Sequence, residues 1–377
     1  MKKALYSTSA LVAAGALALV ASDASAQAKK ISMSVGGYFN TFAGFSQQES
    51  SFENDTATAG LEVGYDAFNV VNDSEVYFKG STKLDNGVGV SVTVQLETDQ
   101  SNGSDIDESY ATLTGGFGSI LLGSTKGSTI KKHVGAPAVG GLALTTLDHH
   151  NWIIRPSAVG GATFSTGTTA GASDAMKVVY LSPKIAGGIE LGASYTPSST
   201  NSDAMPATGG DSGTESQMWD AVVKYSGKMG GSSVNANVGY GETQGTAANS
   251  TQFIRTGVNM TAGGATIGFS YKDISNQATG IEGTANSDEQ TSYNIGIKYA
   301  AGGYTVGLAY GHSELPLASS TQGDDELDKY ILGIERGLGA GVTLTGQLAY
   351  VDYSDETTND SNNNNGWALV GGVKVAF

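Results

Sequence analysis

Asp148, His149 and His150 stand side by side in this sequence, and carboxylate and imidazole groups can bind metals and move protons. Adjacent histidines rarely reach one ion together, and no second cluster of His, Asp or Glu shows a metal-ligand spacing. The chain has no cysteine, so thiolate ligands, disulfides and thiol nucleophiles are excluded. Serine is abundant, but no motif places one beside a base and an orienting group. The sequence therefore predicts no catalytic residue, no enzyme activity and no metal site at 148–150.

Three acidic clusters offer a second kind of chemistry, because hard oxygen ligands suit Ca²⁺. They lie at 105–108, at 324–326 and between Asp352 and Asp360, in stretches that read as polar connections. The main interpretation is solvated outer loops. The alternative is Ca²⁺ bound in those loops, with four candidate ligands: Asp105, Asp107, Asp324 and Asp325. No other cofactor is expected.

The elements that must position these groups are short strands, and the hairpin at 75–97 shows their pattern most clearly. Apolar and polar residues alternate from Glu75 to Leu84 and again from Val88 to Glu97, on either side of Asn86-Gly87. Asn-Gly predicts a two-residue reversal, in which both central residues need a positive φ. One face is rich in valine, whereas the other carries four charges: Glu75, Lys79, Lys83 and Glu97. A packed core would not accept these charges, so the charged face is expected to meet water and the valine face lipid.

The same alternation recurs along the chain and predicts sixteen strands, joined by short glycine-rich turns and longer polar loops in strict alternation. This pattern is typical of outer-membrane barrels, and an even strand number lets the last strand pair with the first. After residue 26 no run of eighteen apolar residues occurs, so no transmembrane helix is expected. The predicted fold class is all-β, a 16-stranded antiparallel transmembrane β-barrel.

Tyrosines near the strand ends fall on the apolar phase of the alternation. Tyr is favoured at membrane interfaces, so these residues are expected to form a girdle around the barrel, although ordinary β-propensity would also place Tyr in strands. They are Tyr195, Tyr225, Tyr240, Tyr271, Tyr299, Tyr304, Tyr310 and Tyr350.

One stretch of about fifty residues, 125–175, lacks the alternation and is called the long segment here. A structureless connection of that length is usually functional, so we expect it to fold into the lumen and narrow it. Lys79 and Lys83 are expected to form a basic cluster with Arg255, facing Asp148 across the constriction. The full set of candidate pore-lining residues is Asp148, Arg155, Lys79, Lys83, Glu75, Glu97, Arg255, Lys131 and Lys132.

The amino-terminal residues have the features of a removable signal peptide. Lys2 and Lys3 precede a short apolar run, and Ala24-Ser25-Ala26 gives the small-x-small pattern that signal peptidase reads. We therefore expect residues 1–26 to be cleaved and residues 27–377 to form one barrel domain. The formal charge of −16 argues against a nucleic-acid partner, which needs a basic face.

Taken in order, several segments resemble the Gram-negative general (diffusion) porins, in particular the α-proteobacterial type. The matching pieces are the leader ending at Ala26, Glu75 to Gly80 before the Asn86-Gly87 turn, Tyr110 to Gly123, Tyr180 to Pro183 with Ile189 to Tyr195, and Val373 to Phe377. The resemblance implies a homotrimer in the outer membrane that passes small hydrophilic solutes by diffusion. It also implies contact with lipid and lipopolysaccharide, and recognition of Phe377 by the barrel-assembly machinery.

The resemblance further implies that acidic residues of the long segment face basic residues of the wall. This chain departs from that arrangement, because the acids of the segment are Asp148 and Asp174, whereas its basic residues and histidines are Lys126, Lys131, Lys132, His133, His149, His150 and Arg155. From the acidic total and outer loops we expect a weak cation preference. Two alternatives stay open: a substrate-selective channel in which aromatics such as Trp152 stack on sugars, and an adhesive or structural surface barrel.

Overall fold

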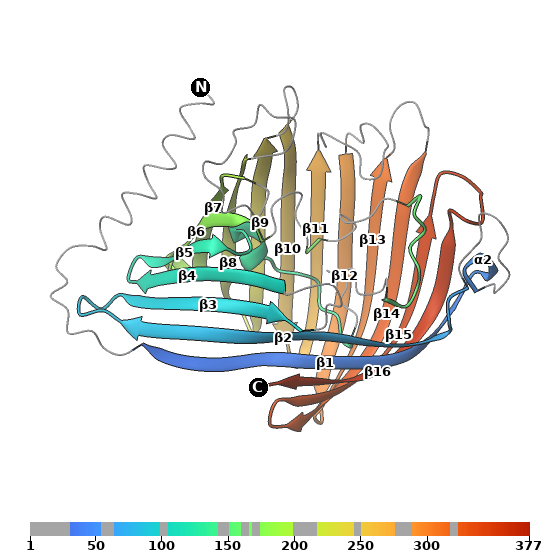
Figure 1. Cartoon of the computed structure of the whole chain (residues 1–377), viewed down its shortest axis with the longest axis horizontal. Helices are drawn as coiled ribbons and strands as arrows, with labels where there is room; N and C mark the ends of the chain where they lie inside the picture. The colour runs from blue at the N-terminus through green and yellow to red at the C-terminus, as the bar shows by residue number, and fades with distance from the viewer. Residues whose placement is uncertain are drawn as a thin grey trace.

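The computed structural model describes residues 31–53, 64–98, 105–141, 151–159, 166–167, 174–198, 217–244, 250–275, 289–316 and 323–377. In this part of the chain sixteen antiparallel strands form one closed ring, in which sequence neighbours pair and β16 returns to β1 (Figure 1). The predicted fold class and strand number are confirmed. The first eight strands are β1 (Ser32–Gln48), β2 (Phe68–Lys83), β3 (Gly89–Glu97), β4 (Asp105–Gly115), β5 (Gly118–Ser124), β6 (Met176–Leu181), β7 (Ile189–Thr196) and β8 (Gln217–Met229).

The remaining strands are β9 (Ser232–Gln244), β10 (Ser250–Ala262), β11 (Ala265–Ser275), β12 (Glu289–Ala301), β13 (Tyr304–Pro316), β14 (Asp324–Gly339), β15 (Val342–Ser354) and β16 (Asn364–Ala376). Within the described residues the helical elements are the single turns α2 (Ser50–Glu53), α3 (Ser128–Lys131) and η2 (Ala186–Gly188). No helix among the described residues has the length and apolar character needed to cross a membrane.

Closure depends on the pairing of the first and last strands, which lie side by side in Figure 1. Their register runs from Tyr38 opposite Ala376 to Gln48 opposite Gly366. Beyond it, Gly37 and Phe377 exchange two backbone hydrogen bonds of 2.9 and 3.1 Å. Along this register the two terminal strands satisfy each other's backbone groups, as lipid requires.

Each strand of the ring has two faces of opposite character. One face, called the apolar face, carries exposed apolar side chains such as Phe78 and Val92, which is 49% exposed. The other, called the polar face, carries Lys79 opposite Thr93 on the neighbouring strand. The alternation predicted for this hairpin is confirmed, because cross-strand partners keep the same phase.

Aromatic rings form a continuous row on the apolar face of β12 to β16. Tyr293, Tyr310, Tyr330, Tyr350 and Trp367 follow one another with ring centroids 6.0, 4.8, 6.2 and 4.8 Å apart. Rings stacked across neighbouring strands stabilise the sheet and suit the level of the membrane interface. The predicted placement of Tyr310 and Tyr350 on the apolar face agrees with this row.

The turn after β2 differs from the predicted Asn-Gly reversal. Leu84 N donates to Val88 O at 2.8 Å, so three residues, 85–87, make the turn. Gly87 has φ +87°, but Asn86 does not have a positive φ. Asp85 joins the turn, which matches the three-residue hairpin with a left-handed last residue.

The polar face is not wet throughout, contrary to the expectation from the sequence. On β13 to β16 it carries a buried apolar cluster that includes Leu327, Ile331, Val351 and Val370. Side chains of the long segment, 152–159, pack on this cluster and complete it. Apolar residues are stable on this face because another part of the chain covers them, and the alternation within a strand cannot show what covers it.

The barrel wall is uneven in height. Strands β5, β6 and β7 have 7, 6 and 8 residues, whereas β8, β9 and β10 have 13 each. At about 3.3 Å per residue and a tilt of about 40°, seven residues rise only ~18 Å, less than the ~25 Å apolar band of a membrane barrel. This low part of the wall is called the short wall below.

Candidate functional site

The beginning of the long segment is held by carboxylates and hydroxyls of the polar face. Asp220 of β8 accepts hydrogen bonds from Ser128 Oγ (2.5 Å) and Thr129 N (2.8 Å). Ser194 of β7 accepts from Ser128 N at 3.3 Å, and Thr125 Oγ1 donates to Glu108 of β4. The free amides at the start of a helix need such acceptors, so Asp220 fixes the place where α3 begins.

From α3 the segment crosses the polar face, and side chains of successive strands bind its backbone. These bonds join Val134 N to Asn237 Oδ1 (2.9 Å), Asn259 Nδ2 to Gly135 O (2.9 Å), Ala136 N to Ser270 Oγ (3.3 Å) and Gln347 Nε2 to Val139 O (3.1 Å). The four side chains come from β9, β10, β11 and β15. A buried stretch without regular structure needs partners for its amides and carbonyls, and the wall supplies them.

The far part of the described segment is attached near the strands that close the ring. Ile154 N donates to Gln48 Oε1 at 2.7 Å, and Asn364 Nδ2 donates to Ile154 O at 2.6 Å. Trp152 and Ile153 are buried in the apolar cluster of β13 to β16, with Trp152 only 3% exposed. The suggestion that Trp152 stacks on sugars is therefore wrong, because its ring packs against the wall. Arg155, a predicted constriction residue, donates to Val159 O at 2.8 Å within the segment.

Ion pairs between segment and wall have the reverse polarity to the one the resemblance implied. Lys126 lies 3.7 Å from both Asp107 and Glu108, and Lys131 lies 3.5 Å from Glu108. Lys132 pairs with Glu190 of β7. The basic side chains thus belong to the segment and the acidic ones to the wall, so the charges of Lys131 and Lys132 are largely compensated locally.

The expected basic cluster of Lys79, Lys83 and Arg255 does not form. β2 and β10 are eight strands apart in either direction around the ring, so Arg255 lies on the opposite side of the barrel. Arg255 is also fully buried, as are Lys272 and Lys329, and cannot line open water. Alternation predicts which face of the strand a residue lies on. It does not predict where the residue lies around the ring, or whether another part of the chain buries it. The proposed partner Asp148 lies outside the described residues, as do His149 and His150.

The wall that the described segment leaves accessible lies on β1 to β3 and is acidic and aromatic. Glu75 stands directly opposite Glu97, on the same face as Lys79 and Lys83. Tyr38 Oη donates to Asp73 and Glu75, at 2.9 Å each. Lys79 Nζ lies 5.2 Å from the centre of the Tyr77 ring. Facing carboxylates repel each other, so this patch attracts cations from solution.

The predicted Ca²⁺ ligands are not in outer loops. Asp105 and Asp107 belong to β4, and Asp324 and Asp325 begin β14, because strand pairing extends further than the alternation suggested. Carboxylate oxygens of Asp107 lie within 4.8 Å of those of Glu75 and Glu97, and Asp325 is similarly close to Asp355 and Glu356. Asp324 is exposed, and the side chain of Asp105 is outside the described part. Both groups offer hard oxygen ligands, which suit a divalent cation.

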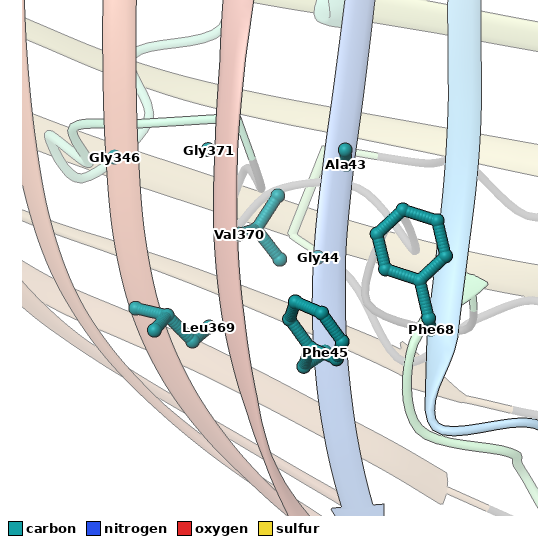
Figure 2. A pocket seen from close by; sticks show the side chains of 8 residues that line it. All are labelled: Ala43, Gly44, Phe45, Phe68, Gly346, Leu369, Val370 and Gly371. Carbon is teal, nitrogen blue, oxygen red and sulfur yellow. The ribbon is translucent and has the colours of Figure 1, made fainter.

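A groove of about 390 Å³ opens on the apolar face between β1, β2, β15 and β16 (Figure 2). Small residues form its floor, since Gly371 pairs with Ala43 on one side and with Gly346 on the other. Phe45, Phe68 and Leu369 stand around it, with the Phe45 and Phe68 rings 5.0 Å apart. Phe45 and Leu369 are each 61% exposed, so the groove lies where this face would meet lipid or another chain.

Sequence reasoning missed two kinds of residue in this site. Inward glycines such as Gly257 and Gly333 contact the segment, and apolar inward residues such as Leu327 and Val370 pack beneath it. A signal for the second kind was present, because β13 to β16 carry apolar residues on both phases of the alternation.

A sealed ring with a lipid-type exterior and a polar interior crossed by a long connection defines a membrane-spanning β-barrel channel. The sequence profile of Gram-negative porins matches residues 10–356, and the chain belongs to this family. It is an outer-membrane porin. A comparison with curated proteins gives no match.

Solved structures with a similar fold include an anion-selective porin from Comamonas acidovorans, at 17% identity, covering 92% of this chain and 100% of that one, TM-score 0.63. The trimer form of OmpT, an outer membrane protein of Vibrio cholerae, has 12% identity, coverage of 93% and 100%, and TM-score 0.59. A mutant of the Rh. blastica porin has 16% identity, coverage of 92% and 100%, and TM-score 0.55. At these identities the likeness is one of fold.

Proposed function

We propose that the channel works by passive diffusion of small hydrophilic solutes and ions, through a bore that the long segment narrows. The observation that carries this proposal is the row of hydrogen bonds from the segment to inward side chains of β8, β9, β10, β11 and β15. A segment bound to that many strands lies inside the bore, along one side of its wall. The open path then runs along β1 to β4.

Weak cation preference is the selectivity that the accessible charges support. On the uncovered wall the carboxylates of Asp73, Glu75 and Glu97 outnumber the ammonium groups of Lys79 and Lys83. Arg255, Lys272 and Lys329, which are also basic residues of the polar face, are buried. The ammonium groups of the segment already pair with carboxylates of the wall. The Comamonas porin is described as anion-selective, so fold alone does not set the sign, and the residues of the path decide it.

Planar-bilayer recording tests both parts. Wild-type protein should give stepwise, non-saturating conductance, and in a salt gradient the reversal potential should indicate a modest excess of cation flux. A bilayer that stays silent would favour an adhesive or structural barrel. A strong anion preference would overturn the proposed sign.

A substrate-selective channel is the second candidate, and one observation favours it. Tyr38 and Tyr77 lie with ring centroids 6.3 Å apart beside Asp73 and Glu75, and rings beside carboxylates suit sugars or organic cations. Liposome swelling separates the two candidates. Flux that saturates for one solute indicates selective binding, whereas flux that falls smoothly with solute size indicates diffusion.

The short wall and the apolar groove support a homotrimer. Strands β5 to β7 are too short to span the apolar band alone, so another protein surface is expected to cover them. The Vibrio cholerae relative is described in a trimer form. Cross-linking and light scattering of the detergent-extracted protein test this; a monomer of full activity would contradict it.

Export and membrane partners complete the proposal. We expect residues 1–26 to be removed as a signal peptide and the barrel to contact lipid and lipopolysaccharide through its apolar face. Phe377 lies at the ring closure, exposed, where the barrel-assembly machinery could bind it. Sequencing the amino terminus of the mature protein tests the cleavage before Gln27. Deleting Phe377 should lower the yield of folded barrel in the outer membrane.

A further inference from the structure

Seven glycines lie on the polar face of the strands that the long segment crosses. In strand order from β7 to β14, without β8, they are Gly192, Gly239, Gly257, Gly268, Gly296, Gly307 and Gly333. None has a positive φ, so the backbone conformation does not require glycine at these positions. The reason for glycine must therefore be space.

The atoms that fill this space belong to the segment. A Cβ placed on Gly257 would lie 1.7 Å from Val134 O, and one on Gly333 would lie 1.7 Å from Val139 O. A Cβ on Gly296 would lie 2.0 Å from Pro137 O. These clashes are with backbone carbonyls, which cannot move aside by changing a side-chain rotamer.

The other four glycines make the same kind of contact with segment side chains. A Cβ on Gly239 would lie 2.8 Å from Thr129 Cγ2, and one on Gly307 would lie 2.6 Å from Val139 Cγ2. The matching distances are 3.0 Å from Gly192 to Ser128 and 2.8 Å from Gly268 to Pro137. At these two positions a wall side chain lies nearer still, Val222 at 2.8 Å and Asn259 at 1.7 Å.

The contacts occur in the same order along the segment and along the strands of the wall. Ser128, Thr129, Val134, Pro137 and Val139 of the segment meet β7, β9, β10, β11–β12 and β13–β14 in turn. Gly268 pairs directly with Gly296, and Gly307 with Gly333. The glycines thus form a shallow track along the wall beneath the segment backbone, interrupted at β8 by Val222, which pairs with both Gly192 and Gly239.

Polar side chains beside the track hold the backbone there. Asn237, Asn259, Ser270 and Gln347 bind the segment between Val134 and Val139 at 2.9 to 3.3 Å. The glycines supply the close approach that these short side chains need in order to reach the backbone. Without that approach the segment would lie further into the bore.

We propose that this glycine track positions the long segment and thereby sets the free width of the bore. The seven glycines are positioning residues. Any added Cβ at Gly296 or Gly333 must move the facing carbonyl by roughly 1 Å or more toward the barrel axis. The effect on conductance rests on the proposed function, whereas the seating itself does not.

A disulfide reporter measures the seating directly, because the native chain has no cysteine. The Cβ position of Gly307 is 3.1 Å from Val139 Cβ, close to the ~3.5–4.5 Å of a disulfide. The pair Val139→Cys with Gly307→Cys should therefore oxidise readily in the folded barrel. The control pair, Val139→Cys with Gly346→Cys, should not, because Gly346 faces the opposite side of the wall.

The test adds Gly296→Ala and Gly333→Ala to the reporter. The matched control adds Gly231→Ala and Gly337→Ala, since no atom lies within 4 Å of a Cβ at either position and neither glycine has a positive φ. Folding is checked by resistance to heat and detergent. We expect the track variant to lose most of the disulfide yield and, without the cysteines, to show lower single-channel conductance, while the control keeps both.

Retention of the disulfide in a folded track variant would overturn the inference. Loss of the disulfide with unchanged conductance would uphold the seating and overturn the proposed constriction instead. If the track variant does not assemble, a second reporter decides: Thr129→Cys with Gly239→Cys, whose Cβ positions are 3.4 Å apart. Failure of that pair to oxidise in an otherwise native barrel would also refute the seating.

Discussion

Neutralising the facing glutamates of the accessible wall, Glu75→Gln with Glu97→Gln, is expected to lower the cation preference of the channel. Their carboxylates are within 4.8 Å of each other and of Asp107, on a wall open to water. One unit charge about 5 Å from a passing ion contributes about 0.8 kcal/mol in water, and screening at 0.1 M salt lowers this to about 0.5 kcal/mol. Removing both charges then lowers the cation concentration beside the wall by up to about fivefold and raises the anion concentration by the same factor.

The assay is the reversal potential in a planar bilayer under a salt gradient, repeated at higher salt, where screening should shrink the difference. The matched control is Asp328→Asn with Asp352→Asn, which removes two charges from the apolar face, where the two residues pair across β14 and β15. A glutamate double variant with the wild-type reversal potential would refute the reasoning. An equal shift in the control would refute it too, because net charge rather than the path would then set selectivity.

Three further predictions concern the segment and the turns. Trp152→Ala removes a side chain that is 3% exposed, at a cost of about 3–5 kcal/mol of stability. The end of the segment near β1 should then loosen, and the single-channel current should become noisier. Trp367→Ala, at a site 53% exposed, should leave the noise unchanged, and equal noise in both variants would contradict the burial of Trp152. Burial, together with Arg255 and Lys272, lowers the pKa of His133 from 6.5 to about 3, so the seated segment holds a neutral imidazole. A lifted segment gains a proton as pH falls below 6.5, so the seated state loses stability from pH 6.5 towards 3. The disulfide yield of the Val139–Gly307 reporter, divided by the yield of the same reporter carrying His133→Gln at the same pH, should therefore decrease over this range. The ratio cancels the loss of thiolate at low pH, and a flat ratio would sink the idea. Gly118→Ala should lower stability by more than about 1 kcal/mol, because Gly118 has φ +102° and an added Cβ would lie 2.2 Å from Leu181 O. The shift in gel mobility on heating measures the stability. Gly116→Ala, where no atom lies within 4 Å of the added Cβ, is the control, and equal melting of the two variants would contradict the prediction.

The porin comparison narrows what these experiments must decide. Family membership establishes a channel in the outer membrane. The three solved structures described above are only 12% to 17% identical to this chain. Charge selectivity depends on a few side chains in the bore, and such side chains vary while the barrel stays the same. The reversed polarity of the segment-to-wall ion pairs makes this chain a useful case, since Lys132 and Glu190 exchange the roles that the resemblance implied.

Local periodicity determined the barrel and the faces of its strands. Lys79 and Val92 are on the faces that alternation predicted, because a strand turns successive side chains to opposite sides whatever surrounds it. The long segment also ends where the alternation resumes, at Met176. These features need no information from beyond a few neighbouring residues.

Tertiary structure alone decided what the segment covers and which charges meet. Arg255 shares the phase of a water-facing residue but is buried, and Trp152 lies in an apolar cluster built from strands more than 150 residues later in the chain. Gly257 and Gly333 have no side chain to mark a face, and their role becomes visible only when Val134 and Val139 lie against them. The sequence by itself determined a closed barrel with one long connection. The path of that connection depends on contacts between distant residues, which no local pattern encodes.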